Sequence, residues 1–153
     1  MKIASLSMLI CILLIPISGA YAENSLSVLD AWILEAPPGM KVMAGYMTIR
    51  NDTDHAYDLT GVESNHFERV EMHRTIIESE QARMEKQDKM IVKAGDTLRF
   101  KPGGSHLMLF NPIKSLKKGD EIDLTLLLRN GNKIKVIAQI RRHSEMMNIT
   151  HRH

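Results

Sequence analysis

Four side chains of this protein stand out as candidate ligands of a soft metal ion. They are His73, Met84, His106 and Met108. The thioether sulfur of methionine binds hard cations poorly and suits Cu(I), and the imidazole of histidine also binds copper. A set of histidine and methionine without a thiolate therefore favours Cu(I) over zinc. Methionine is also a common filler of apolar cores, so each of these residues taken alone is more often a core or surface residue than a ligand.

Two of these residues, His106 and Met108, are separated by one position in a predicted strand. Successive side chains of a strand point to opposite faces, so both side chains are expected on one face, with Leu107 and Leu109 directed toward the core. The strand follows a proline-glycine-glycine break at 102–104, which is a strong turn signal. The sequence therefore predicts two ligands side by side with a hydrophobic anchor behind them.

The other two residues are expected on separate elements. His73 lies near the middle of a predicted strand, Arg69 to Ile77, and its neighbour Met72 should point to the opposite face. The polar stretch Glu78 to Arg83 is predicted to be a hairpin loop, with Met84 in it or just after it. A methionine on such a loop would be partly exposed, which suits an accessible ligand better than a core residue.

The elements that must position these residues are predicted to be short strands, without a long helix. The clearest hairpin surrounds Asn130-Gly131, a pair favoured where both central turn residues need positive φ. Many short strands with frequent turns indicate a sandwich or barrel, and we expect one all-β domain. The predicted strands are Val28–Ala36, Ala44–Arg50, Tyr57–Val62, Arg69–Ile77, two pieces of Ile91–Phe100 around Ala94-Gly95-Asp96, His106–Phe110, Ile122–Leu128 and Ile134–Ile140.

The first 22 residues are predicted to be a secretory signal peptide. They combine an early lysine, an apolar centre and the small-x-small pattern Ala20-Tyr21-Ala22, with cleavage expected after Ala22. An uncleaved membrane anchor is the alternative. The single cysteine, Cys11, lies inside this segment, so the exported chain would have no disulfide. We expect an exported protein whose metal-binding domain spans 23–142.

Composition argues against nucleic acid as a partner, because the formal net charge is only +2 and there is no long basic run. The C-terminal stretch 143–153 differs from the rest, since it lacks strand alternation and is rich in metal ligands. We predict a flexible metal-binding tail able to take Cu(II), whose ligands either join the main site or form a second one. The alternative is a polar tail whose histidines are accidental. Its candidate ligands are His143, Met146, Met147, His151 and His153.

The spacing of the four main residues resembles a known family signature. Ten residues separate His73 from Met84, twenty-one separate Met84 from His106, and one separates His106 from Met108. This pattern, with the block Lys101 to Leu109, is similar to that of the periplasmic copper chaperone family PCu(A)C, also called DUF461. Further similarities, over most of Val28 to Ile140, are Val70-Glu71-Met72-His73, Trp32, Pro37-Pro38-Gly39 and Gly45-Tyr46.

The resemblance implies a cupredoxin-like Greek-key β-barrel that binds one Cu(I) through His73, Met84, His106 and Met108 at an exposed edge. It also implies a metallochaperone that delivers copper in the periplasm for assembly of the CuA centre of cytochrome c oxidase. The expected partner is then a copper-accepting periplasmic or membrane-bound protein, such as a subunit of that oxidase.

The residue chemistry itself favours transport over catalysis. A blue-copper electron carrier needs a cysteine thiolate, which the exported chain would lack, and hydrolytic zinc sites combine histidine with carboxylates. We therefore expect no enzyme. The alternatives are a copper or zinc enzyme that uses the same ligands, and a structural β-sandwich whose methionines only fill the core.

Overall fold

The computed structural model describes residues 26–79 and 81–142, and within them every regular element is a strand. No helix in this described part is long and apolar enough to cross a membrane. The predicted signal peptide and the predicted metal-binding tail lie outside the described residues. The strands are β1 Leu26–Leu34, β2 Val42–Asn51, β3 Tyr57–Glu63, β4 Phe67–Glu78, β5 Gln81–Lys86, β6 Met90–Val92, β7 Thr97–Phe100, β8 Ser105–Pro112, β9 Glu121–Leu128 and β10 Lys133–Arg141.

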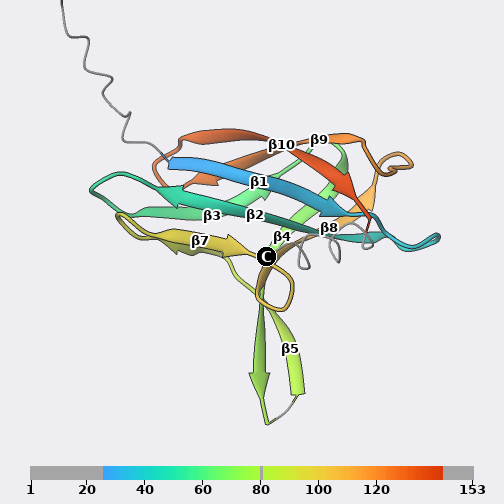
Figure 1. Cartoon of the computed structure of the whole chain (residues 1–153), viewed down its shortest axis with the longest axis horizontal. Helices are drawn as coiled ribbons and strands as arrows, with labels where there is room; N and C mark the ends of the chain where they lie inside the picture. Colours follow the sequence, from blue (N-terminus) through green and yellow to red (C-terminus); the bar gives the residue numbers. More distant parts are fainter. Residues whose placement is uncertain (1–25, 80, 143–153) are drawn as a thin grey trace, which may run out of the picture.

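The strands form one sheet in the order β5-β4-β8-β7-β2-β1-β10-β9-β3-β6, and β2 also pairs with β8. Strands that follow one another in the chain are often not adjacent in the sheet, as β2 and β3 or β8 and β9 show. Most pairs are antiparallel, whereas β1 pairs in parallel with β10, as β7 does with β8. The body of the molecule is elongated, and the end of β4 projects from it together with β5 as a separate hairpin (Figure 1). The predicted all-β fold is confirmed.

Alternation along the strands builds the core. In β9 the side chains of Ile122, Leu124 and Leu126 are buried, and Asp123 between them is exposed. Burying one large aliphatic side chain contributes about 2 kcal/mol, so a strand with one such face is held firmly in its register. Strand β8 follows the same rule, with Leu107 and Leu109 fully buried. The core thereby fixes the strand that carries two of the four candidate ligands.

The hairpin between β9 and β10 lies where Asn130-Gly131 predicted it, but its turn has a different conformation. Only Gly131 takes a positive φ, 86°, whereas Asn130 does not. The ladder pairs Leu127 with Lys133, and the Leu128 amide then donates to the Asn132 carbonyl at 3.0 Å. The loop is therefore longer than a two-residue turn, so one left-handed glycine suffices.

One segment was predicted wrongly. The stretch Glu78 to Arg83 is not a loop: β4 continues to Glu78, and β5 begins at Gln81 and pairs back along it. The exposed side chains of β5 lie on both of its faces, so the strand lacks the apolar alternation that marks a half-buried strand. The prediction of two short strands within Ile91–Phe100 is confirmed by β6 and β7, between which Gly95 takes a positive φ of 67°.

Candidate metal centre

The antiparallel ladder between β4 and β8 brings the two histidines together. His73 is the direct partner of His106, and Glu71 is the partner of Met108 two positions along. Directly opposed residues in such a pair have adjacent side chains on one face of the sheet. The imidazole rings lie with their centroids 5.9 Å apart and their planes tilted by 30°.

The turn before β8 determines where His106 lies. Gly103 adopts a positive φ of 73°, and the Gly104 amide donates to the Lys101 carbonyl at 3.0 Å. The chain then enters β8, and the His106 side chain becomes largely buried, with 6% exposure. Its Nδ1 lies 3.0 Å from the Gly104 carbonyl oxygen, so Nδ1 must carry the hydrogen that this bond needs. The lone pair of the neutral ring is therefore on Nε2.

His73 is hydrogen-bonded through Nε2, whereas His106 is bonded through Nδ1. Nε2 of His73 lies 2.9 Å from Oε2 of Glu71. The other carboxylate oxygen, Oε1, contacts Arg69 at 2.9 Å and Lys86 at 3.2 Å. The hydrogen bond from His73 lowers the pKa of Glu71, and the charges of Lys86 and Arg69 lower this pKa further, so the carboxylate is ionised at neutral pH. An ionised carboxylate only accepts hydrogen bonds, which places the imidazole hydrogen on Nε2.

The other nitrogen of His73, Nδ1, is buried and has no hydrogen-bond partner among the described residues. A buried acceptor without a partner costs about 1–3 kcal/mol, so such atoms are uncommon in folded proteins. Metal-binding histidines typically donate their second nitrogen to a carboxylate or carbonyl, which is the arrangement of both His73 and His106. A metal ion bound to Nδ1 would satisfy this atom, so the residues fit such a group.

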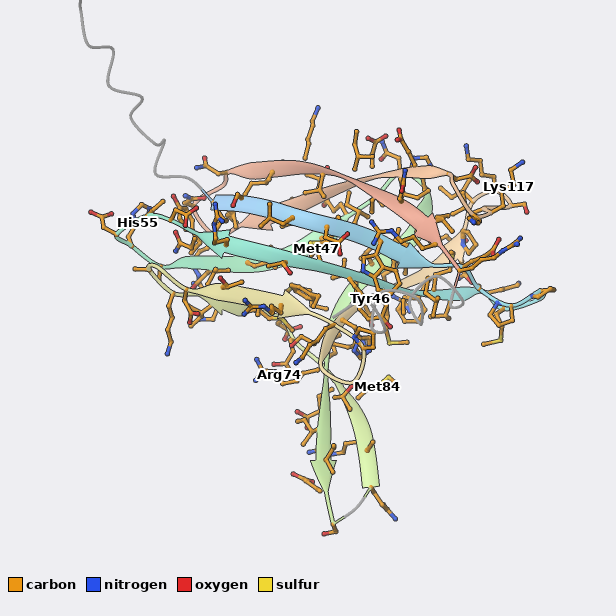
Figure 2. The ribbon with its side chains drawn as sticks, in the orientation of Figure 1. Tyr46, Met47, His55, Arg74, Met84 and Lys117 are labelled. Carbon is orange, nitrogen blue, oxygen red and sulfur yellow. The ribbon has the colours of Figure 1, made fainter. Side chains whose placement is uncertain are left out.

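The two methionines complete the arrangement. Met108 is half-buried on β8, and Met84 on β5 is 62% exposed and pairs across the ladder with Thr75. Figure 2 shows Met84 at the root of the projecting hairpin, next to the body of the molecule. A pocket of about 570 Å³ is lined by Met40, Val42, Met43, Ala44, Tyr46, Thr75, Met84, Gly103, His106 and Met108.

Three of the four predicted ligands, Met84, His106 and Met108, thus line one pocket, and His73 adjoins it through the ring of His106. Within 26–79 and 81–142, no three histidine, cysteine, aspartate or glutamate side chains gather as a metal site. A metal ion bound here would therefore need thioether ligands. The five predicted tail ligands lie outside the described residues.

Sequence reasoning missed three residues of this region: Met40, Tyr46 and Glu71. Glu71 could have been found, because it lies two positions before His73 and alternation puts both on one face. Tyr46 forms the wall of the pocket, packs on Trp32 with ring centroids 4.4 Å apart, and has a raised pKa because it is buried. Met40 carries no local signal, since it follows a turn and lies far in sequence from the four candidate ligands.

Comparison with known proteins finds relatives of the part of the chain that forms the sheet. Residues 26–140 match the family model described as "Putative lipoprotein LpqE-like". The protein RP573 of Rickettsia prowazekii, itself uncharacterised, is 32% identical over 95 residues. That match takes in 61% of the chain and 52% of RP573, so the chain spans about half the length of this relative.

Solved structures resemble the fold. The copper-bound PCuAC domain of PmoF2 superposes with a TM-score of 0.66 at 22% identity, over 80% of the chain and 97% of that domain. The Cu(I) form of DR1885 from Deinococcus radiodurans superposes with a TM-score of 0.62 at 26% identity, over 82% of the chain and 84% of DR1885. The cupredoxin-like fold is thereby confirmed. With the family model matched from 26 to 140, the chain belongs to the LpqE-like family, which is the PCu(A)C or DUF461 family.

Proposed function

We propose that this protein is an exported metallochaperone that carries one Cu(I) ion bound by His73, Met84, His106 and Met108. The observation that carries the proposal is the state of the two imidazoles. Each has one nitrogen tied to an acceptor, and Nδ1 of His73 is buried without a hydrogen-bond partner in the described part of the chain. Beside them lies the pocket that Met84 and Met108 line. Copper-bound relatives with the same fold support copper as the metal.

The four donors suit reversible binding. Nδ1 of His73 and Nε2 of His106 would supply neutral nitrogen, and Met84 and Met108 would supply neutral sulfur. Such a set stabilises monovalent copper without adding negative charge, whereas Cu(II) and Zn²⁺ bind better to nitrogen and oxygen. Met84 is exposed, so a recipient protein could approach the ion from this side. The structure thus favours transfer of the metal over its retention.

The recipient and the compartment are further parts of this proposal. The family description as lipoproteins supports export, and the predicted signal peptide supports delivery to the periplasm. There the recipient would be a copper-accepting protein, such as the cytochrome c oxidase subunit that holds the CuA centre. Transfer of Cu(I) from the loaded protein to the purified soluble domain of that subunit tests this step, and a CuA domain that gains no copper would contradict it.

The ligand assignment is tested by the double variant His106→Ala with Met108→Ala. We expect loss of stoichiometric Cu(I) binding in competition with a Cu(I) chelator, and circular dichroism would report whether the sheet persists. Because His106 is largely buried, the variant Met108→Leu provides a second test that removes the sulfur and keeps the volume. His55→Ala is the control, since His55 lies at the far end of the molecule (Figure 2). Undiminished affinity in both test variants would remove these residues from the site.

Metal preference and turnover separate this role from the alternatives. Titration under reducing conditions should give one Cu(I) per protein and much weaker binding of Zn²⁺. Tighter binding of Zn²⁺ at this site would contradict the chaperone role. Oxygen consumption catalysed by the copper-loaded protein would instead support an enzyme, and absence of any Cu(I) uptake would support a structural β-sandwich.

A further inference from the structure

A third methionine, Met40, borders the same pocket as Met84 and Met108. It follows the turn Pro37-Pro38-Gly39, in which Gly39 takes a positive φ of 84° and the Met40 amide donates to the Pro37 carbonyl at 3.1 Å. The next residue is tied to β8, because the Asn111 amide donates to the Lys41 carbonyl at 2.7 Å. The backbone of Met40 is therefore held beside the strand that carries His106 and Met108.

The exposure of Met40 does not fit a core-filling role. Its side chain is 58% exposed, close to the 62% of Met84, whereas Met43 in the same wall is only 4% exposed. A methionine that fills a gap in the core is buried, as Met43 is. The thioethers of Met40 and Met84 therefore lie at the rim of the pocket, and both are accessible to an ion that enters or leaves it.

Met40 also has room to move. Besides the main pocket it borders a smaller hollow of about 170 Å³ near Pro112 and Leu116. The unbranched methionine side chain has three rotatable bonds and is here mostly exposed, so packing does not hold its sulfur in one position. The position of the sulfur is thus adjustable while the backbone is fixed.

On the basis of the proposed function, we infer that Met40 is a third thioether ligand that exchanges with Met84 at the outer position of the copper site. His73, His106 and Met108 hold the ion from the inner side in both arrangements. When Met40 replaces Met84, one Cu–S bond forms and one breaks, and the oxidation state and the number of ligands stay the same. Met84 is then free to give way to a ligand of a recipient protein, and the ion is never left with three ligands in water.

A double-mutant cycle tests this exchange. Met84→Leu alone should lower the Cu(I) affinity only slightly, by less than about threefold, because Met40 takes the vacant position. In a Met40→Leu background, the same change should lower the affinity by about tenfold or more, since no outer sulfur is left. Met40→Leu alone should also lower the affinity by less than about threefold, because Met84 still supplies an outer sulfur. Leucine keeps the side-chain volume in each case, so the variants remove sulfur and little else.

Met43→Leu is the matched control, because Met43 lines the pocket but is buried. Combined with Met84→Leu it should give only the sum of the two single effects. A direct readout is the methyl carbon resonance of Met40 in protein labelled at the methionine methyl groups. This resonance should shift when Cu(I) is added, and it should shift further in Met84→Leu.

The outcomes separate this inference from the function on which it rests. If the unaltered protein takes up no stoichiometric Cu(I), the proposed function itself fails. If it binds one Cu(I) but Met84→Leu has the same effect with and without Met40, the exchange is overturned. A Met40 methyl resonance that stays unchanged on Cu(I) binding also overturns it. So does a double-mutant cycle in which the effect of Met84→Leu depends on Met43 and not on Met40.

Discussion

At the scale of single residues, Glu71 decides which nitrogen His73 offers to a metal. Glu71→Gln replaces the ionised acceptor by a neutral amide, which holds the imidazole hydrogen on Nε2 less firmly. We expect the Cu(I) affinity to fall about tenfold, as is typical when the partner of a metal-binding histidine is lost. Chelator competition measures this. Glu85→Gln is the control, because Glu85 pairs with Arg83, whereas the carboxylate bonded to His73 is that of Glu71. An equal loss of affinity in both variants would mean that the removed negative charge matters and the hydrogen bond to His73 does not.

The buried phenol of Tyr46 predicts that the folded protein loses stability at alkaline pH. Burial raises the pKa of its phenol, so the group stays neutral in the folded protein at a pH where it ionises in the unfolded chain. The resulting contribution to stability is complete below the ordinary tyrosine pKa and is lost as pH rises through the higher folded value. Absorbance titration of tyrosinate should show one late component that Tyr46→Phe removes. A titration curve unchanged by this substitution would contradict the prediction.

At the scale of elements, strand β2 packs closely against β8 at Gly45, which pairs with Leu107. A Cβ atom there would lie 3.0 Å from Cδ1 of Leu109 and 3.2 Å from Cβ of Leu107, and both leucines are fully buried. Gly45→Ala should therefore push β8 outward, with a cost of about 1–3 kcal/mol in the free energy of unfolding. The Cu(I) affinity should fall too, because Leu107 lies between His106 and Met108.

Gly61→Ala is the matched control for this prediction. Its added Cβ would meet only Cδ1 of Leu127, at an ordinary contact distance of 3.5 Å. Urea unfolding compares the free energies, and chelator competition compares the affinities. If both alanine variants behave alike, close strand packing is not what Gly45 provides.

Asn51 connects the end of β2 to two other segments. Its fully buried side-chain amide donates to the carbonyls of His55 at 2.8 Å and Val92 at 3.1 Å, and its oxygen accepts from the Thr53 amide at 3.0 Å. Asn51→Ala leaves these partners unsatisfied and should lower the free energy of unfolding by about 3 kcal/mol. Urea unfolding measures the loss, and the Cu(I) affinity of the folded fraction should be unchanged. Asn51→Asp keeps the acceptor and loses the donor; full stability in that variant would contradict the role of the amide.

At the scale of the whole molecule, the tail 143–153 is predicted to add to metal capture but not to folding. Strand β10 ends at Arg141, and among the described residues its ladders with β1 and β9 reach no further than Arg141. Removal of 143–153 should leave the unfolding temperature nearly unchanged and reduce Cu(II) uptake, because three imidazoles are lost. Calorimetry and copper titration measure both. Equal stoichiometry and affinity for both copper oxidation states, with and without the tail, would refute a metal site there.

The amino-acid sequence by itself determined the strand-rich fold and the chemistry of the donors. Period-two alternation is local, so it predicted that Leu107 and Leu109 are buried and that His106 and Met108 share one face. The choice of sulfur and imidazole, and hence the preference for Cu(I), follows from residue types alone. The same logic failed at β5, because a strand exposed on both faces has no apolar alternation to detect.

The tertiary structure alone decided which residues meet. The pairing of His73 with His106 depends on the register of β4 against β8, which packing of the whole core sets and no local pattern encodes. The hydrogen bond from His73 to Glu71, which leaves Nδ1 unpaired, became visible only with side chains in place. Met40 lies on a connection between strands, and its approach to the pocket follows from where the turn before β2 lies against β8. Contacts between distant segments are set by the balance of all packing interactions. For this reason the sequence predicted candidate ligands but not their geometry.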